Sequence, residues 1–538
     1  MPDSPTSQQG EAQRRPGRSI LGSTIVQGGL TMLSRVVGLV REQVRGYYLG
    51  TGMESDAFGI ASTIPNMLRR LFAEGAMTAA FVPVFTGLAS DGDRERLCRF
   101  FSGFMTLFVL LMVGVTLLGV LLAGPLIEHI FAGRFSEVPG KVTLTIGLTR
   151  VMFPYLLLVS IAAIVQATLN SFRIFGPSAF SPVLLSVVNI CAVVFFSDWF
   201  ENPAWALAVG FLLGGVLQMA FQIPFLRGHG LRFRPTLAGF RDPAIHAVAR
   251  TFLPGVFSAG IYQINVTVSQ VIATSLDPGS VASLQYSLRL QELVLGVFAV
   301  AVATVVLPTM SEQVHRGQMD ALKETLRYSI GLLGFITIPA SAGLILLAVP
   351  VVRVLFQYGR FDAHSTQMTA FALYFHTAGI FFVAMQRNVV QVFYAQRDTK
   401  TPTLIAAVVM VLHIALCYSL AIPLRHGGIA AAGSVAAAFN VALLYAVLRR
   451  RIGRLGSRAL ARSLCRTAIA TLVMSALVAV PRLLGAFDGV SRAELAWRLA
   501  LTILAAMVCF ALVARLLGSE ELGEFAALVR RKFSRHSR

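Results

Sequence analysis

Long apolar stretches with few charges run through almost the whole sequence. A helix that crosses the hydrocarbon core of a bilayer, roughly 30 Å thick, needs about 20 apolar residues, and fourteen such stretches follow one another along the chain. Only 13% of the residues are charged, against about 25% in soluble proteins, which excludes an ordinary soluble enzyme. The sequence therefore predicts an all-α polytopic membrane protein of about fourteen spans, near 24–48, 56–88, 100–124, 143–171, 179–197, 203–226, 249–275, 281–310, 327–349, 366–395, 402–423, 427–448, 463–481 and 495–517.

The second stretch is too long for one straight crossing. Pro65 and Pro83 lie inside it, and a proline removes one helical hydrogen bond and clashes with the preceding turn. We therefore expect a bent or broken element between residues 56 and 88.

The basic residues fall mostly in the short gaps between the spans. Lys and Arg outnumber Asp and Glu by 46 to 26, which gives a net charge of +20. Cytoplasmic loops of membrane proteins carry an excess of Lys and Arg. With the N-terminus inside, 28 of these residues fall in predicted cytoplasmic segments or at the span edges next to them, and 8 in predicted outer loops or at the span edges next to them. The asymmetry predicts an even number of spans with both termini cytoplasmic, and it explains the charge without a nucleic-acid partner.

Short segments of similar sequence recur at an offset of about 225 residues. AAFVP at 79–83 aligns with TVVLP at 304–308, and NSFR at 170–173 aligns with YAQR at 394–397. Because duplicated lobes around a central site are typical of transporters, we expect two pseudo-symmetric six-helix lobes followed by two further helices. The expected parts are a disordered cytosolic leader (1–19), an N-terminal lobe (20–226), a basic cytosolic loop (227–248), a C-terminal lobe (249–448), a second basic loop (449–462), spans 13 and 14 (463–517) and a basic cytosolic tail (518–538).

The first span carries four charged residues on one face. At 100° per residue, Arg35, Arg41, Glu42 and Arg45 lie within one third of the helix circumference, with Gly38 near the middle of that face. A charge at the bilayer centre costs about 2.5–3.5 kcal/mol on insertion scales, so this face is expected to line a water-filled cavity. The alternative is that the residues from Arg41 to Arg45 mark a helix end and extend to the interface.

The second stretch also carries charges. Asp56 lies near its start, and Arg70 and Glu74 are spaced i,i+4 so that they can form an ion pair next to Arg69. Pro65 and the following Asn66 can leave free backbone groups at a hinge; an interfacial amphipathic helix is the alternative for this segment.

In the eighth span, Arg289 and Glu292 are spaced i,i+3 in an apolar setting, which favours a functional role for the pair. A surplus of arginines in a membrane cavity fits an anionic guest, because the planar guanidinium group binds phosphate with two parallel hydrogen bonds. A lipid-linked diphosphate is a natural ligand, whereas a small organic cation would be repelled.

Other polar features give weaker signals. Asp91 and Asp93 form a DxD motif, as in metal-dependent sugar transferases, but a solvated turn is the favoured interpretation. His376 and His413 lie inside spans, where a hydrogen-bonded histidine is favoured over a proton relay.

The five cysteines show no CxxC spacing, so neither zinc nor a disulfide framework is expected. The chain has no GxxxxGK[ST] phosphate loop to power transport with ATP, and the run from Arg449 to Arg451 is expected to contact anionic lipid.

Several sequence blocks resemble the MurJ/MviN family, lipid II flippases of the multidrug/oligosaccharidyl-lipid/polysaccharide exporter superfamily. The blocks are SRVVGLVRE (34–42), DAF (56–58), PNMLRRLFAEGA (65–76), AFVP (80–83), FPY (153–155), GGVLQ (214–218) and FQYG (356–359). The chain departs from the family pattern at Glu42, where Asp is common, and at Leu288, where an acidic residue is often found.

The resemblance implies a fourteen-helix bacterial inner-membrane transporter, not an enzyme. Such a transporter would move lipid II to the outer leaflet by alternating access, and the last two spans would form a groove for the polyprenyl tail. Its expected substrate-binding residues are Ser34, Arg35, Gly38, Arg41, Arg69, Arg70 and Arg289, and the expected gating or charge-balance residues are Glu42, Asp56, Pro65, Asn66, Glu74 and Glu292.

We expect no cofactor and no metal, and transport driven by the membrane potential or an ion gradient. Expected partners are lipid II, anionic membrane lipids and cell-wall synthesis proteins. The alternatives are a flippase for another polyprenyl-diphosphate glycan, a membrane-embedded transferase and a non-transporting cell-wall scaffold. A transferase would need a catalytic constellation for which only Asp91 and Asp93 are available.

Overall fold

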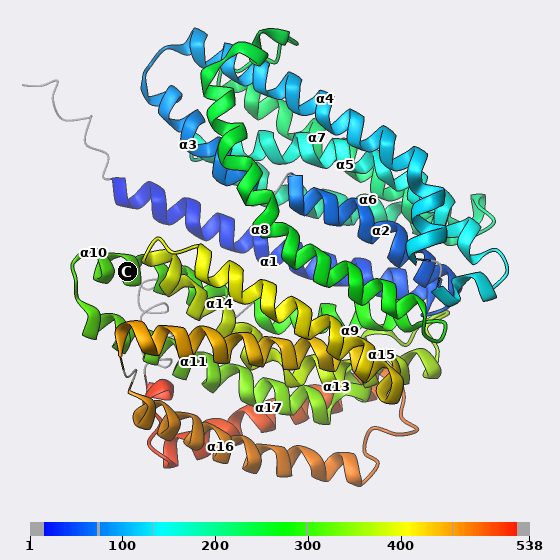
Figure 1. Cartoon of the computed structure of the whole chain (residues 1–538). Coiled ribbons are helices and arrows are strands. Elements are labelled where there is room, and N and C mark those ends of the chain that lie inside the picture. The colour runs from blue at the N-terminus through cyan, green and yellow to red at the C-terminus, as the bar shows by residue number, and fades with distance from the viewer. Residues whose placement is uncertain (1–15, 73–75, 132, 297–299, 454–455, 524–538) are drawn as a thin grey trace, which may run out of the picture. The chain divides into compact units, whose positions relative to one another are not determined.

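The computed structural model describes residues 16–72, 76–131, 133–296, 300–453 and 456–523, and within these ranges the chain is helical without strands (Figure 1). The long helices are α1 (Pro16–Leu49), α2 (Met53–Phe72), α3 (Ala76–Ser90), α4 (Arg94–Leu126), α5 (Lys141–Ser171), α6 (Gly176–Phe196), α7 (Pro203–Gly228), α8 (Pro243–Thr274), α9 (Ser280–Val294), α10 (Val300–His315), α11 (Met319–Leu346), α12 (Ala348–Phe356), α13 (Ala363–Ala378), α14 (Ile380–Ala395), α15 (Lys400–Ile452), α16 (Ser457–Leu483) and α17 (Arg492–Leu516). Four short helical turns, η1 (Ile127–Phe131), η2 (Gly133–Glu137), η3 (Ser197–Trp199) and η4 (Leu237–Arg241), join some of them. The expected all-α class is confirmed.

Many of these helices have the length and composition of membrane spans. In the part of the chain that the structure describes, nine helices pass this test, or eleven if each of two bent helix pairs counts as one span. Large apolar side chains face outward, such as Ile422 (84% exposed) and Leu483 (85% exposed), as expected for a lipid-facing surface. The multi-pass membrane class is therefore confirmed, while the count of fourteen stays a prediction.

The 53-residue α15 is two helices joined by a tight reversal. Arg425 has φ 48° and ψ −133°, which no α-helix adopts. A side chain at Gly428 would overlap the carbonyl oxygen of Leu420, although residues eight apart in a straight helix are separated by about 12 Å. The chain thus turns back at Arg425, between the spans expected at 402–423 and 427–448.

In the described residues, the second expected span is covered by α2 and α3, and whether it is bent or broken between them stays a prediction. α2 continues through Pro65 to Phe72, and α3 contains Pro83 in its interior. Residues 73–75, and with them Glu74, lie outside the described ranges. α1 already begins at Pro16, so the last four residues of the expected leader are helical, and the first fifteen lie outside the described residues.

Contacts between Cα atoms divide the chain into two compact units. The first unit comprises 1–42, 65–121 and 150–256, and the second comprises 43–64, 122–149 and 257–538. The division crosses α1, α2, α4, α5 and α8. Each unit combines separate chain segments, and the lobes expected at 20–226 and 249–448 stay a prediction.

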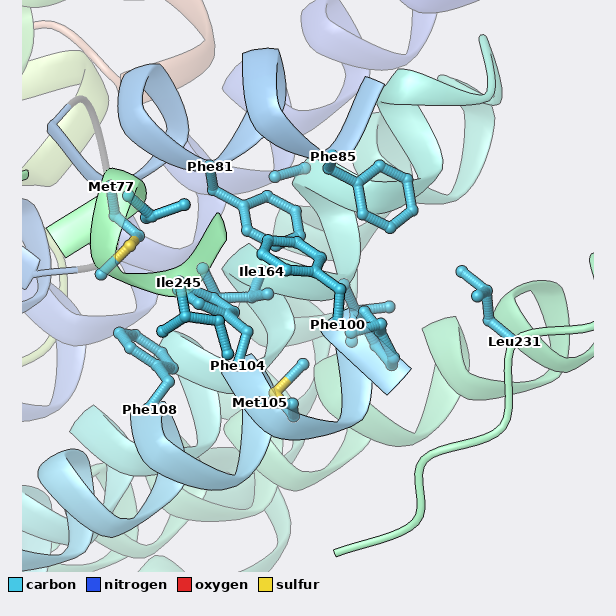
Figure 2. Close-up of a cluster of buried hydrophobic side chains, with 14 of the residues drawn as sticks. Met77, Phe81, Phe85, Phe100, Phe104, Met105, Phe108, Ile164, Leu231 and Ile245 are labelled. Atoms are coloured by element: carbon cyan, nitrogen blue, oxygen red, sulfur yellow. The ribbon is translucent and has the colours of Figure 1, made fainter. Parts of the chain in front are cut away.

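Aromatic rings fill the core of the first unit. Phe81 and Phe85 of α3 lie against Phe100, Phe104 and Phe108 of α4 (Figure 2), and the ring centroids of Phe81 and Phe104 are 4.8 Å apart. Aromatic pairs contribute about 0.5–1.5 kcal/mol beyond their area burial. Because lipid tails are as apolar as phenylalanine, close packing and dispersion rather than removal from water hold such helices together in a bilayer.

Close packing also depends on a glycine between α4 and α5. A Cβ at Gly119 would overlap the ring of Phe153, so the two helices approach each other only because residue 119 has no side chain. Gly114, in the same helix, would meet nothing within 4 Å.

In the second unit, α16 and α17 lie side by side and α16 contacts α11 (Figure 1). Three arginines connect this helix pair, and the loop between its helices, to α11 and α12 by donating to backbone carbonyls. Arg353 Nη1 donates to Phe487 O (2.9 Å), Arg482 Nη1 to Leu346 O (2.6 Å) and Arg492 Nη2 to Gln357 O (2.6 Å). Leu346 and Gln357 stand at the C-terminal ends of α11 and α12, so two of these bonds satisfy carbonyls that the helix ends would otherwise leave without donors.

Candidate functional site

The charged face of α1 lies partly open in the first unit. Ser34 and Arg35 are partly exposed. If residue 38 carried a Cβ atom in place of the glycine hydrogen, this atom would contact no neighbouring atom within 4 Å. The Arg35 side chain makes no hydrogen bond or ion pair with another described residue. A guanidinium group on an apolar helix therefore remains available to water or to a ligand.

Further along this face, the charges are partly balanced by neighbours. Arg41 Nη2 donates to Glu42 Oε1 at 2.8 Å, and Glu42 is buried. The Arg41 guanidinium carbon lies 5.7 Å from the centroid of the Phe211 ring of α7, within range of a cation–π interaction. Glu42 thus lies where it can balance the charge of Arg41.

The second half of α2 presents two more arginines in the first unit. Arg69 Nε donates to Asn66 Oδ1 at 3.3 Å. Arg70 is partly exposed and, among the described residues, has no hydrogen-bond or ion-pair partner. The expected pair of Arg70 with Glu74 cannot be described, because Glu74 lies outside the described ranges. Pro65 is buried in the interior of α2.

In the second unit, α9 carries the expected pair of Arg289 and Glu292. Arg289 Nη1 lies 3.0 Å from Glu292 Oε2, and the two side chains are 48% and 40% exposed. The pair is therefore not enclosed by protein. A partly exposed charge pair on an apolar helix requires contact with water or with a polar ligand.

Asp56 is the centre of a buried cluster that joins α2, α5 and α9. Its Oδ2 accepts from Lys141 Nζ at 2.8 Å and from Gly279 N at 2.7 Å, and its Oδ1 accepts from Ala282 N at 2.9 Å. The side chains of Asp56 and Lys141 are 1% and 2% exposed. We call Asp56, Lys141, Gly279 and Ala282 the α9 anchor.

The α9 anchor has a clear electrostatic basis. The first N–H groups of a helix lack intrahelical partners and carry partial positive charge, so a carboxylate is stabilising there. Gly279 has φ +90°, and a Cβ there would overlap the carbonyl oxygen of Thr51. Sequence analysis identified Asp56 but missed Lys141, which stands at the very start of a span where lysines usually extend to the interface.

Surface ion pairs surround the anchor in the same unit. Asp277 lies in the loop before α9, where its carboxylate pairs with Arg134 (3.6 Å) and with Arg425 at the α15 reversal. Arg360 Nη1 pairs with Glu54 Oε2 at 2.6 Å. Exposed pairs contribute about 0–1 kcal/mol each, so these contacts supplement the buried anchor.

Arg45 does not face an open surface. It is buried, with its guanidinium carbon 5.2 Å from the centroid of the Phe58 ring and 5.1 Å from that of Tyr286. Its Nη2 donates to Gln285 Oε1 at 3.0 Å and to Ser55 O at 3.3 Å. Arg45 therefore joins the end of α1 to α2 and α9, and neither of the sequence-based interpretations, cavity lining or an interfacial helix end, describes it.

The weaker candidates have local structural roles. Asp93 Oδ1 accepts from Arg96 N at 2.9 Å in an exposed turn, and the described residues contain no group of three potential metal ligands. His376 Nδ1 lies 2.9 Å from Ser287 Oγ, and His413 Nε2 lies 3.4 Å from Cys417 Sγ. Both histidines are therefore hydrogen-bonded, as the sequence favoured.

Comparison with known proteins adds information on the family. A family model described as lipid II flippase MurJ matches residues 46–514, so its match begins after the charged block at 34–42. A probable lipid II flippase MurJ of Vibrio cholerae is 37% identical over 438 residues, which cover 80% of this chain and 82% of that protein.

Two solved structures are similar to the fold. A lipid II flippase MurJ in an inward closed conformation superposes with a TM-score of 0.76 and 26% identity, covering 91% of this chain and 98% of that chain. An inward-facing MATE transporter of the MOP superfamily has a TM-score of 0.64, with 80% of this chain and 99% of that chain covered. At 17% identity, the second similarity concerns the fold alone.

Proposed function

The chain belongs to the lipid II flippase MurJ family, and from that premise we propose that it moves lipid II, an undecaprenyl-diphosphate-linked peptidoglycan precursor, from the inner to the outer leaflet by alternating access. The observation that carries the proposal is the family match over residues 46–514. The protein is then a transporter of cell-wall biogenesis and not an enzyme.

Arginines on apolar helices bind the anionic headgroup. Arg35 and Arg70 support this role, because both are partly exposed and neither has an acceptor among the residues that the structure describes. A diphosphate supplies acceptors that match the guanidinium fork. The full set of proposed headgroup ligands is Ser34, Arg35, Gly38, Arg41, Arg69, Arg70 and Arg289.

The α9 anchor holds the outer side closed. The charge asymmetry of the loops predicts that the starts of α2, α5 and α9 lie outside. Asp56 and Lys141 are almost fully buried in this cluster, so separating these helix ends requires breaking their ion pair. Glu42, Pro65, Asn66, Glu74 and Glu292 remain proposed gating or charge-balance residues.

Charge also suggests how transport is driven. Moving one charge through the membrane potential contributes about 2.3 kcal/mol per 100 mV, and a cationic cavity that carries an anionic lipid changes its net charge during the cycle. We therefore assign the driving force to the membrane potential or an ion gradient, without a cofactor.

The environment follows from the same assignment. The protein lies in the bacterial cytoplasmic membrane with both termini inside, α16 and α17 accommodate the polyprenyl tail, and the run from Arg449 to Arg451 contacts anionic lipid. Cell-wall synthesis proteins are the proposed protein partners, and nucleic acid is not a partner.

The test is to deplete the protein in its own cell and to measure lipid II in the outer leaflet with an impermeant probe. Wild-type protein and the control Arg99→Gln, which alters an exposed ion pair with Glu95, should restore outer-leaflet lipid II. Arg35→Ala and Arg289→Ala should not restore it, at normal protein levels.

Unchanged lipid II distribution after depletion, in a cell without a second flippase, would overturn the proposal. Accumulation of a different polyprenyl-diphosphate glycan would point to the alternative substrate. Full complementation by both arginine variants would favour a non-transporting scaffold.

A further inference from the structure

Three described residues other than glycine have a positive φ angle, and all three are arginines. The φ values are 63° at Arg173, 59° at Arg397 and 48° at Arg425. This left-handed region costs free energy for any residue with a Cβ and is normally occupied by glycine. Strained residues of this kind persist only where surrounding contacts hold them, and they cluster at functional sites such as ligand-binding positions.

Two of the three arginines occupy equivalent turns. Arg173 N donates to Asn170 O (2.9 Å) and Ile174 N to Leu169 O (3.0 Å) at the end of α5. In the same pattern, 224 residues later, Arg397 N donates to Tyr394 O (2.9 Å) and Asp398 N to Phe393 O (2.8 Å) at the end of α14. Both turns are Schellman motifs, in which glycine is the usual left-handed residue.

The third arginine shows why such strain can be retained. Arg425 pairs with Asp277, so its side chain has a visible partner. Arg173 and Arg397 are exposed, and the side chain of neither makes a hydrogen bond or ion pair with any residue in the described ranges. No acceptor for either side chain lies in the described part of the chain, so both guanidinium groups are open to an anionic ligand there.

Both turns lie next to further basic groups. In the first unit, Arg94 Nη2 donates to His229 O (3.0 Å), and the His229 ring is stacked on Phe172, which precedes Arg173. In the second unit, Arg451 binds Asp398, which follows Arg397. Arg173 and Arg397, whose side chains have no acceptor in the described part of the chain, therefore each follow a helix end with another arginine nearby, and an anion there would be stabilised by the basic charge.

We propose that Arg173 and Arg397 are binding residues for the phosphate groups of anionic phospholipids. Both arginines follow the end of an apolar helix, which places them at the level of the lipid headgroups in the adjacent leaflet. The planar guanidinium fork binds a phosphodiester through two parallel hydrogen bonds. These sites lie outside the proposed headgroup ligands of lipid II, and they do not depend on which lipid is transported.

The test uses the full-length protein purified in a neutral detergent. Apparent Tm is measured while phosphatidylglycerol, phosphatidylcholine or inorganic phosphate is added to wild type, Arg173→Gly, Arg397→Gly and the corresponding Lys variants. Without lipid, each Gly variant should melt about 1–2 °C higher than wild type, because glycine relieves the strained backbone. The control Arg99→Gln removes an exposed arginine of α4 that has ordinary helical geometry.

With phosphatidylglycerol, wild type and the control should be stabilised, and half-maximal stabilisation of each Gly variant should require about fivefold more lipid. The Lys variants should keep part of the response, since they retain the charge but lose the two parallel hydrogen bonds of the guanidinium fork. An unchanged phosphatidylglycerol response in both Gly variants would overturn the proposal, as would an equal response to phosphatidylcholine. A lower Tm of the Gly variants without lipid would assign the arginines to the helix ends instead, and an equal response to inorganic phosphate would replace the lipid with a soluble anion.

Discussion

Replacing Lys141 by Met tests whether the α9 anchor controls the outer side of the protein. The substitution keeps the apolar stem but removes the ammonium group 2.8 Å from Asp56. The Asp56 carboxylate, 1% exposed, then retains two backbone donors but no opposite charge. Removing one partner of a buried ion pair costs about 3–5 kcal/mol, so Lys141→Met should lower stability by this amount.

A double-mutant cycle distinguishes this loss from a packing effect. Asp56→Leu alone leaves a buried ammonium group without an opposite charge and should be similarly destabilising. The double variant has no buried charge, and its remaining loss is the missing acceptor for the α9 N-terminus, about 0.5–2 kcal/mol. The double variant should therefore be more stable than either single variant, with a coupling energy of at least about 2 kcal/mol.

Stability is measured as the apparent Tm of the purified protein, and opening is measured by labelling. Val281 is fully buried beside the anchor, so Val281→Cys, in a variant without the five native cysteines, should react slowly with an impermeant maleimide added outside intact cells. Labelling should rise in Lys141→Met. Lys323→Met is the matched control, because Lys323 pairs with an exposed aspartate and should change neither quantity.

Two results would refute this reasoning. If the double variant loses as much stability as the two single variants added together, Asp56 and Lys141 are not energetically coupled. If Lys141→Met is destabilised but labelling at residue 281 does not change, the anchor is a structural element and not part of the outer gate.

Three further predictions concern packing and charge elsewhere. Gly119→Ala should cost about 1–3 kcal/mol because its Cβ overlaps a ring of α5, whereas Gly114→Ala, in open space on the same helix, should be neutral or slightly stabilising; apparent Tm measures both. Hydrogen bonds from Thr401 are the main reason why the pKa of Asp398 is lowered to about 2, so this carboxylate stabilises the protein above about pH 4 and loses its contribution as the pH falls toward 2. Because it lies at the surface, Asp398→Asn should lower stability by less than about 1 kcal/mol at neutral pH, and the difference should vanish near pH 2 in a Tm–pH profile. Arg45→Met should cost about 1–3 kcal/mol through lost cation–π and hydrogen-bond contacts, and an equally stable variant would contradict the buried position of this arginine.

The helical membrane class was predictable because it depends on local composition. Apolar length and the depletion of charge act within each segment, so they predicted a separate span on each side of Arg425. The structure has both spans inside α15, whose 53 residues are helical on either side of the reversal at Arg425. The positions of charges on the first span were equally local, and the structure shows Arg35 partly exposed on that helix.

The close packing of helices that are distant in the sequence was not predictable in the same way. The expected span at 366–395 is divided into α13 and α14 with a bend of 42°, at Gly379. A Cβ at Gly379 would overlap Ser434 of α15, so the bend coincides with a close approach of a helix more than 50 residues away. The pairing of Asp56 with Lys141 likewise joins residues 85 positions apart, and a sequence alone does not show which distant helix ends meet.

The two kinds of charge in this protein follow from one physical requirement. A charged group in an apolar environment must be compensated, either by partners within the protein or by water and ligands. Asp56 and Lys141 are compensated internally, so replacing one of them should reduce stability and transport together. Arg35 has no such partner in the described part of the chain, and its replacement should reduce transport while stability is unchanged. The sequence locates both kinds of charge, but only the three-dimensional contacts separate those that hold the helices from those left open to a ligand.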